Sequence, residues 1–169
     1  LMITKNNYYW LASNSEIPFL ANGDIIEVLH IYSFQELYGF EFAKAKVKMV
    51  DYDGSKVFDA IINLDSLSSD STSLNFEQNK SLYEEVSKDY ENTKSKFLRY
   101  KKTKENPYLN ALNVKFSYSI TCHKAQGGQW SVVFIEKPFL KDGVNKDYLK
   151  WLYTAVTRAE IKLYLIGFS

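Results

Sequence analysis

The chain has 169 residues, of which 46% are hydrophobic and 16% aromatic, and its formal net charge is +1. This length and composition allow a buried core in one domain or two small ones, whereas the near-zero charge excludes a uniformly basic nucleic-acid-binding surface. The single cysteine, Cys122, excludes an internal disulfide framework and fits a reducing compartment.

No window approaches the ~18 apolar residues of a membrane span, and the first residues lack a signal-peptide pattern. We therefore predict a cytoplasmic protein that has no membrane partner. The chain opens abruptly on LMITK, which is already typical of a strand. We expect it to be a piece of a longer protein.

The first part of the chain predicts β-structure. Residues 1–5 are a candidate strand, and Asn22-Gly23-Asp24 is a strong turn signal. Alternation of apolar and polar residues then predicts a small antiparallel sheet with one buried face, and its strands are 25–29, 42–50 and 56–64, with a hairpin turn at 51–54.

A polar loop at 66–73 precedes an amphipathic helix over 75–104, which is either continuous or broken near Asn92 and which ends at 105–107. Its second half, from Asn92 on, carries only basic charges. One interpretation is a solvated face with a favourable charge gradient along the helix dipole. The other is a surface that contacts phosphates, in which Phe97 and Tyr100 lie among the cations and suit a nucleic-acid strand.

The pattern of the last part predicts an α/β arrangement. A strand over 112–120 leads into the stretch 116–136, FSYSITCHKAQGGQWSVVFIE, in which Gly127-Gly128 separates a polar turn from the apolar run 132–135. We expect that run to be an interior strand. The two glycines permit a phosphate to lie against the main chain.

A helix over 145–159 and a strand over 162–168 follow, and this order predicts a parallel crossover unit. Thr154 and Arg158, four residues apart, are neighbours on that helix. If the sheet is parallel, residues 121–129 lie at the carboxyl end of a strand, where ligands bind in open α/β sheets.

Taken singly, His123, Cys122 and the glycine pair fit an ordinary surface histidine, a small buried residue and a plain loop. Together, TCHKAQGGQW (121–130) and LYTAVTRAE (152–160) resemble motifs V and VI of superfamily 1 helicases of the RecD-like and UvrD-like branch. ITKNNY followed by NGD is similar to the stretch that opens the second motor domain of RecD-like helicases.

The resemblance implies an α/β fold with a partial RecA-like parallel sheet of the P-loop NTPase type, interrupted by a small antiparallel β barrel and a long helix. Residues 1–24 and 112–169 would be motor domain 2A, and 25–111 the inserted domain 2B, with its barrel at about 25–65 and its helical arm at about 75–105.

The same resemblance implies roles for individual residues. Arg158 would be the catalytic arginine finger of motif VI, because a guanidinium stays charged and binds two phosphate oxygens. The nucleotide-binding residues would be Gly128, Gln129 and Thr157. Many relatives have glutamate where Gln129 stands. Glutamine can still hydrogen-bond a hydroxyl of the nucleotide sugar, but it carries no charge. By the resemblance, the DNA-binding residues of motif V would be Thr121, His123, Lys124 and Gln126. Further candidates for DNA contact are Asn6, in the ITKNNY stretch, and the basic residues Lys96, Arg99 and Lys101 of the predicted helix.

Neither G-x-x-x-x-G-K-[ST] nor an acidic Walker B strand occurs in the sequence, and no metal site is predicted. We therefore expect the fragment alone not to hydrolyse ATP, with ATP and Mg²⁺ bound mainly by an N-terminal ATPase domain of the same protein. The predicted function is that of the C-terminal part of an ATP-dependent DNA helicase acting on single-stranded or duplex DNA, alone or with repair subunits. The alternatives are a non-enzymatic nucleic-acid-binding or docking module and a motor subunit of an exodeoxyribonuclease complex.

Overall fold

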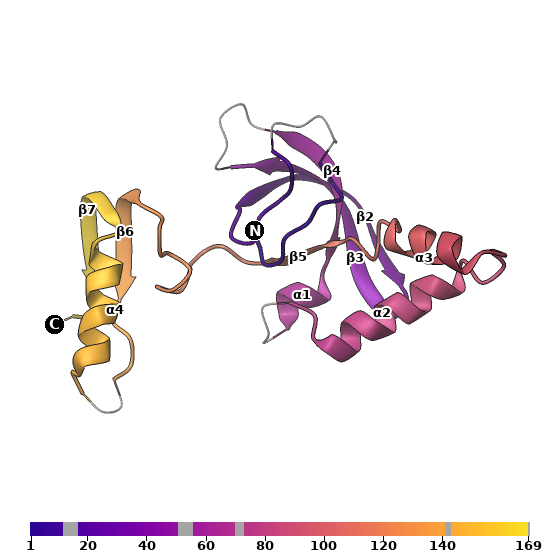
Figure 1. Ribbon diagram of the computed structural model, residues 1–169. Helices are drawn as coiled ribbons and strands as arrows, with labels where there is room; N and C mark the ends of the chain where they lie inside the picture. The colour runs from indigo at the N-terminus through magenta and orange to yellow at the C-terminus, as the bar shows by residue number, and fades with distance from the viewer. Residues whose placement is uncertain (12–16, 51–55, 70–72, 141–142, 169) are drawn as a thin grey trace. The chain divides into compact units, whose positions relative to one another are not determined.

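The computed structural model describes residues 1–11, 17–50, 56–69, 73–140 and 143–168 (Figure 1). The chain divides into two compact units, Leu1–Ser117 and Tyr118–Ser169. The hairpin turn predicted at 51–54 lies outside the described residues.

The first unit is built on a five-stranded sheet with the strand order β1-β5-β4-β3-β2. The consecutive strands β2 (Ile26–Leu37), β3 (Phe40–Met49) and β4 (Val57–Asn63) pair antiparallel, so the predicted antiparallel sheet is confirmed. Strand β5 (Leu112–Lys115) pairs parallel with β4 and antiparallel with β1 (Met2–Ile3).

The sheet does not form a closed barrel among the described strands, because the order leaves β1 and β2 at opposite edges. These edges meet only at an isolated antiparallel bridge between Met2 and Ile25. Two backbone hydrogen bonds flank it, from Ile3 N to Asp24 O at 2.9 Å and from Ile26 N to Leu1 O at 2.8 Å. In place of the predicted barrel, the structure has an open sheet whose two edge strands come together at one end.

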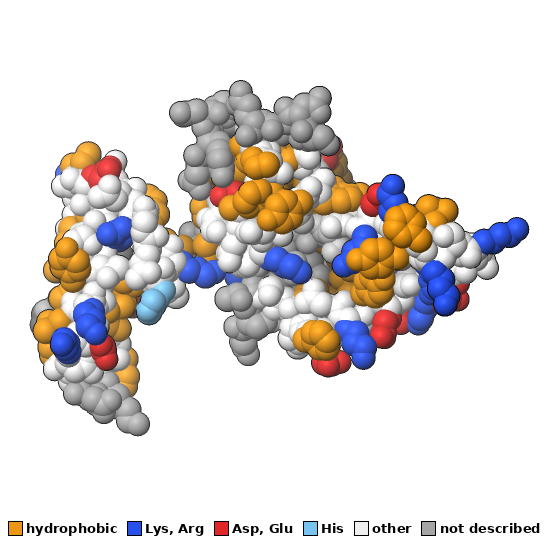
Figure 2. All heavy atoms as spheres, in the orientation of Figure 1, with side chains coloured by type: hydrophobic (Ala, Val, Ile, Leu, Met, Phe, Trp, Pro, Cys, Tyr) orange, Lys and Arg blue, Asp and Glu red, His pale blue; other side chains and the backbone are white. Residues whose placement is uncertain are grey.

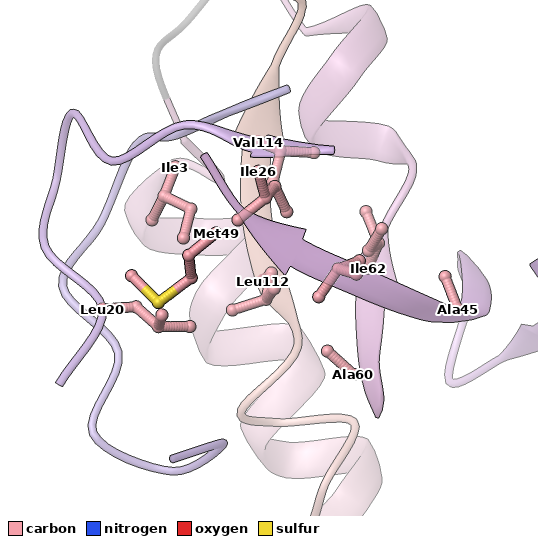
Figure 3. Packing of buried hydrophobic residues seen from close by; sticks show 10 residues of the cluster. Ile3, Leu20, Ile26, Ala45, Met49, Ala60, Ile62, Leu112 and Val114 are labelled. Atoms are coloured by element: carbon pink, nitrogen blue, oxygen red, sulfur yellow. The ribbon is translucent and has the colours of Figure 1, made fainter. Parts of the chain in front are cut away.

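The main core lies within this sheet (Figure 3). Apolar residues that alternate along β3 and β4 point inward and meet residues of β1, β5 and the segment before β2. The cluster consists of Ile3, Leu20, Ile26, Ala45, Val47, Met49, Ala60, Ile62, Leu112 and Val114.

The helical arm consists of two helices, α2 (Phe76–Lys88) and α3 (Lys96–Lys104), so the break near Asn92 is confirmed. Helix α2 starts with a capping box between Asn75 and Gln78 and packs Leu82 and Val86 into a second apolar cluster. The segment predicted as a loop begins instead with the one-turn helix α1 (Asp65–Ser68), whose Ser66 hydroxyl donates to Asn63 O at 2.6 Å.

The second unit contains β6 (Trp130–Glu136), α4 (Lys146–Val156) and β7 (Ala159–Ile166), with β6 parallel to β7. The predicted parallel strand-helix-strand unit is confirmed. The interior position predicted for 132–135 is not found, because β6 has β7 as its one neighbour among the described strands and Phe134 is 65% exposed.

The strand predicted over 112–120 ends at Lys115, and its partners are β4 and β1. The described residues of 1–24 and 112–117 therefore share one compact unit with those of the predicted insertion 25–111. Among the described helices, none combines the length and apolarity needed to cross a bilayer.

Candidate functional site

The polar segment predicted to bind DNA forms a compact turn before β6. Lys124 N and Ala125 N both donate to Thr121 O, at 2.9 and 3.1 Å, and Gly128 N donates to Ala125 O at 3.2 Å. Ala125 is buried and holds the turn onto its unit. The side chains of the motif face solvent, and these are Thr121, His123, Lys124, Gln126 and Gln129.

Positions 127 and 128 require glycine for different structural reasons. Gly127 has a φ of +86°, in the left-handed region that side chains disfavour. At Gly128 the reason is contact, because an added Cβ would lie 2.3 Å from Cη2 of Trp130. The indole therefore covers the backbone of Gly128.

Arg158 joins this turn to the end of α4. Its Nε donates to Thr154 O at 3.0 Å, its Nη1 to Gly128 O at 2.9 Å and its Nη2 to Thr157 Oγ1 at 3.1 Å. In the opposite direction, Trp130 N donates to Arg158 O at 2.9 Å. The two predicted motifs are thus hydrogen-bonded to each other through one half-buried arginine.

Thr157 fixes the arginine from its own side. It is the C-cap of α4, and its hydroxyl lies 2.9 Å from Tyr153 O and 3.1 Å from Thr154 O. Since the hydroxyl hydrogen is directed at these carbonyls, the oxygen lone pairs are free to accept from Arg158 Nη2. Guanidinium N–H groups beyond the three used here remain able to donate to an anion.

Cys122 makes a further link between the turn and α4, since its thiol lies 3.5 Å from Trp151 O. Burial raises the pKa of the Cys122 thiol, and the positive charge of Arg158 opposes this effect in part. The group therefore stays a neutral thiol near pH 7, which suits a packing role better than a nucleophilic one.

The remaining predicted DNA-binding residues belong to the first unit. Asn6 is exposed, and its Oδ1 accepts from Asn22 N at 2.8 Å. On α3, Lys96 is exposed, and Lys101 is 3.8 Å from Glu105. Arg99 is occupied in joining the helices, because its Nε donates to Ser87 Oγ at 3.2 Å and its Nη2 lies 3.7 Å from Glu91.

The structure therefore brings Gly128, Thr157 and Arg158 into one hydrogen-bonded group and places the exposed motif side chains on the adjoining turn. Sequence reasoning missed Trp130 as the cover of Gly128. It also missed the carbonyl of Thr154 as an acceptor for Arg158, although the four-residue spacing was the signal that could have revealed this contact.

The parallel β6-α4-β7 unit and the two linked motifs lie in the part of the chain that has a match among known families. Residues 116–166 match the family model described as the UvrD-like helicase C-terminal domain. The resemblance of the two motifs to UvrD-like helicases is thereby confirmed for this segment.

An uncharacterized protein of Methanocaldococcus jannaschii is 38% identical to this chain over 80 residues. The matched stretch covers 47% of this chain and 6% of that protein. The chain thus corresponds to a small part of a much longer relative.

Proposed function

We propose that this chain is the C-terminal motor part of an ATP-dependent DNA helicase and that Arg158 completes an ATPase site in the full-length protein. The observation that carries the proposal is the reciprocal pair of hydrogen bonds between the two motifs, Arg158 Nη1 to Gly128 O and Trp130 N to Arg158 O. The family match supports the helicase assignment.

In this role Arg158 stabilises negative charge on the transferring phosphate. Phosphoryl transfer depends on positioning and on positive charge placed against phosphate oxygens. The three contacts of the guanidinium restrict its rotation, and its unused N–H groups supply the charge-assisted donors. Lysine cannot reproduce this planar set of donors.

The turn before β6 is the proposed DNA contact. Lys124 supplies a mobile positive charge, and the side chains of Thr121, His123 and Gln126 supply polar groups for phosphate or sugar oxygens. Because this turn ends in the carbonyl that holds Arg158, a shift of the backbone on DNA binding would change the position of the arginine. We propose that DNA stimulates hydrolysis in this way.

ATP supplies the phosphoryl group when bound, and Mg²⁺ neutralises charge on its phosphates. The unused N–H groups of Arg158 suit contact with a phosphate, while Thr157 and the Gly128 carbonyl hold the arginine in place. The part of the chain that the structure describes holds no group of three or more His, Cys, Asp or Glu side chains placed for a metal. We propose that an N-terminal ATPase domain of the full-length protein supplies the metal ligands and most of the nucleotide contacts.

The test is Arg158→Ala in the full-length protein, assayed for ATP hydrolysis with and without single-stranded DNA. We expect DNA-stimulated turnover to fall by roughly 10³- to 10⁵-fold while nucleotide binding persists. Arg158→Lys should also fail, and Lys162→Ala, at an exposed lysine on β7, should behave as the unaltered protein. Near-normal turnover of a folded Arg158→Ala protein would end the assignment.

A second function, a nucleic-acid-binding module without ATPase activity, is favoured by one surface. On α3, Phe97 is 76% and Tyr100 53% exposed, and Lys104 Nζ lies 5.8 Å from the centre of the Tyr100 ring. Figure 2 shows basic and hydrophobic side chains side by side at this end of the first unit. The module is the better description if replacing Lys96 and Lys102 abolishes salt-sensitive DNA binding while Arg158→Ala has no effect in any assay.

A further inference from the structure

The first unit contains a polar pocket that neither motif uses. Its cavity volume is about 240 Å³, and it lies between the segment after β1 and the segment that leads into β5. No acidic side chain is found among the described residues that line it. The lining residues are Lys5, Asn6, Asn7, Tyr8, Tyr9, Leu109, Asn110, Ala111 and Asn113.

Hydrogen bonds between the two segments hold the pocket walls in place. Asn7 Nδ2 and Trp10 Nε1 both donate to Asn110 O, at 2.8 and 2.7 Å. Asn7 also exchanges two backbone hydrogen bonds with Leu20, each 2.8 Å long. The pocket is therefore formed before any ligand binds, which lowers the entropic cost of binding.

Several groups in the lining have unused binding capacity. The Lys5 ammonium and the Asn6 amide nitrogen have no partner among the described residues. The Tyr8 ring is 69% exposed, and its centroid lies 4.7 Å from that of Phe19, which backs it.

This chemistry selects among ligand classes. Because no carboxylate is found among the described lining residues, the pocket offers little charge compensation to a metal ion or an organic cation. An exposed aromatic ring, amides that both donate and accept, and one ammonium match a planar heterocycle with an attached phosphate. The volume is below the ~300–1,000 Å³ of drug-sized ligand pockets, so it suits a single ring system and not a whole dinucleotide.

We propose that this pocket receives one unstacked base of single-stranded DNA, with the base on the Tyr8 ring, its edge on the Asn6 amide, and a flanking phosphate on Lys5. The proposal rests on the proposed function, since it assumes that the protein binds DNA. It adds a contact to a DNA base, made by the first unit, to the contacts with the DNA backbone that we propose for the second unit.

The test compares two fluorescent strands of equal length and charge, an oligothymidine and a fully abasic oligomer, by anisotropy with the whole chain. We expect oligothymidine to bind about tenfold more tightly, as stacking of one base on an aromatic ring allows. Tyr8→Ala should remove most of this preference and leave abasic binding unchanged, whereas Tyr8→Phe should keep it. Lys5→Ala should weaken the binding of both oligomers equally.

Phe76→Ala is the matched control, because Phe76 is 77% exposed and lies outside the pocket lining. The proposed base site would be wrong if the preference for oligothymidine survived Tyr8→Ala and photocrosslinks from 5-iododeoxyuridine mapped away from residues 5–9. The helicase proposal would remain intact in that case. Failure to bind either strand would also overturn the proposed base site. The ATPase assay on Arg158→Ala judges the helicase proposal independently.

Discussion

Arg158, for which we propose a catalytic role, also links two segments of the local fold. Its guanidinium bonds the carbonyls of Thr154 and Gly128, and its own carbonyl accepts from Trp130 N. The loss of this side chain would leave the half-buried carbonyls without their donor, so part of any functional defect would be structural. Assays of Arg158 variants therefore need a parallel measurement of unfolding.

The contact between Gly128 and Trp130 leads to a prediction at the same scale. In Gly128→Ala the new Cβ would overlap the indole, so the ring has to swing outward. Trp130 is already 41% exposed, and we expect a loss of about 1 kcal/mol in unfolding free energy, at the low end of overpacking costs. Urea unfolding and the shift of the Trp130 indole N–H signal in NMR spectra would measure both effects.

The double variant Gly128→Ala/Trp130→Ala is the control for this prediction. Without the indole the added methyl group has space. The loss of unfolding free energy caused by Gly128→Ala should therefore be smaller in the Trp130→Ala background than in the unaltered protein. Equal costs in the two backgrounds would show that the steric account is wrong.

At the scale of elements, the β2–β3 hairpin carries an uncommon residue at its tip. Tyr38 and Gly39 form the two-residue loop with φ values of +58° and +76°, as in a type I′ turn. A tyrosine in this conformation is unfavourable by itself. Its hydroxyl donates to Asp89 Oδ2 at 2.5 Å, and its ring meets Tyr108 edge-on with centroids 5.9 Å apart, so the side chain anchors the hairpin to the end of α2.

This anchor predicts a pH dependence of stability. Burial, with the hydrogen bond to Asp89 and its charge, raises the pKa of Tyr38 to about 12. Because the folded pKa lies above that of the unfolded chain, ~10, the contribution is fully present below pH ~10 and is lost as pH rises towards 12. Urea unfolding between pH 9 and 12 should show a steeper loss of stability for the unaltered protein than for Tyr38→Phe.

Tyr153→Phe, at a 71% exposed tyrosine of the second unit, controls for general alkaline effects. Identical pH profiles for the unaltered protein and Tyr38→Phe would remove Tyr38 as the source of the alkaline loss.

At the scale of the whole molecule, the two units differ in how well their apolar residues are covered. The first has two apolar clusters around a five-stranded sheet. The second has a two-stranded parallel sheet, and Phe134, Ile161 and Leu165 are 65%, 73% and 50% exposed. Parallel sheets are normally covered on both faces, so we expect the second unit by itself to be the less stable of the two.

Limited proteolysis tests this difference. Cleavage should begin in the exposed turn around 118–129 and leave a resistant fragment close to Leu1–Ser117. Mass spectrometry of early digests would identify it, and the fragment should retain a cooperative thermal transition. A first cut inside β3 or β4 would contradict the proposed order of stability.

The sequence alone determined the local structure and the recognition of the family. Alternation predicted β2–β4, the charge and spacing pattern predicted α2 and α3 with their break, and TCHKAQGGQW with LYTAVTRAE identified the helicase segment, because these signals depend on neighbours in the chain.

Only the tertiary structure decided which distant segments meet. It paired β5 with β4 and β1, left the barrel open, made Arg99 a link between helices and formed the pocket between residues 5–9 and 109–113. It also placed the Arg158 guanidinium on the Gly128 carbonyl. Such contacts depend on packing between residues far apart in the chain, which no local pattern of residues encodes.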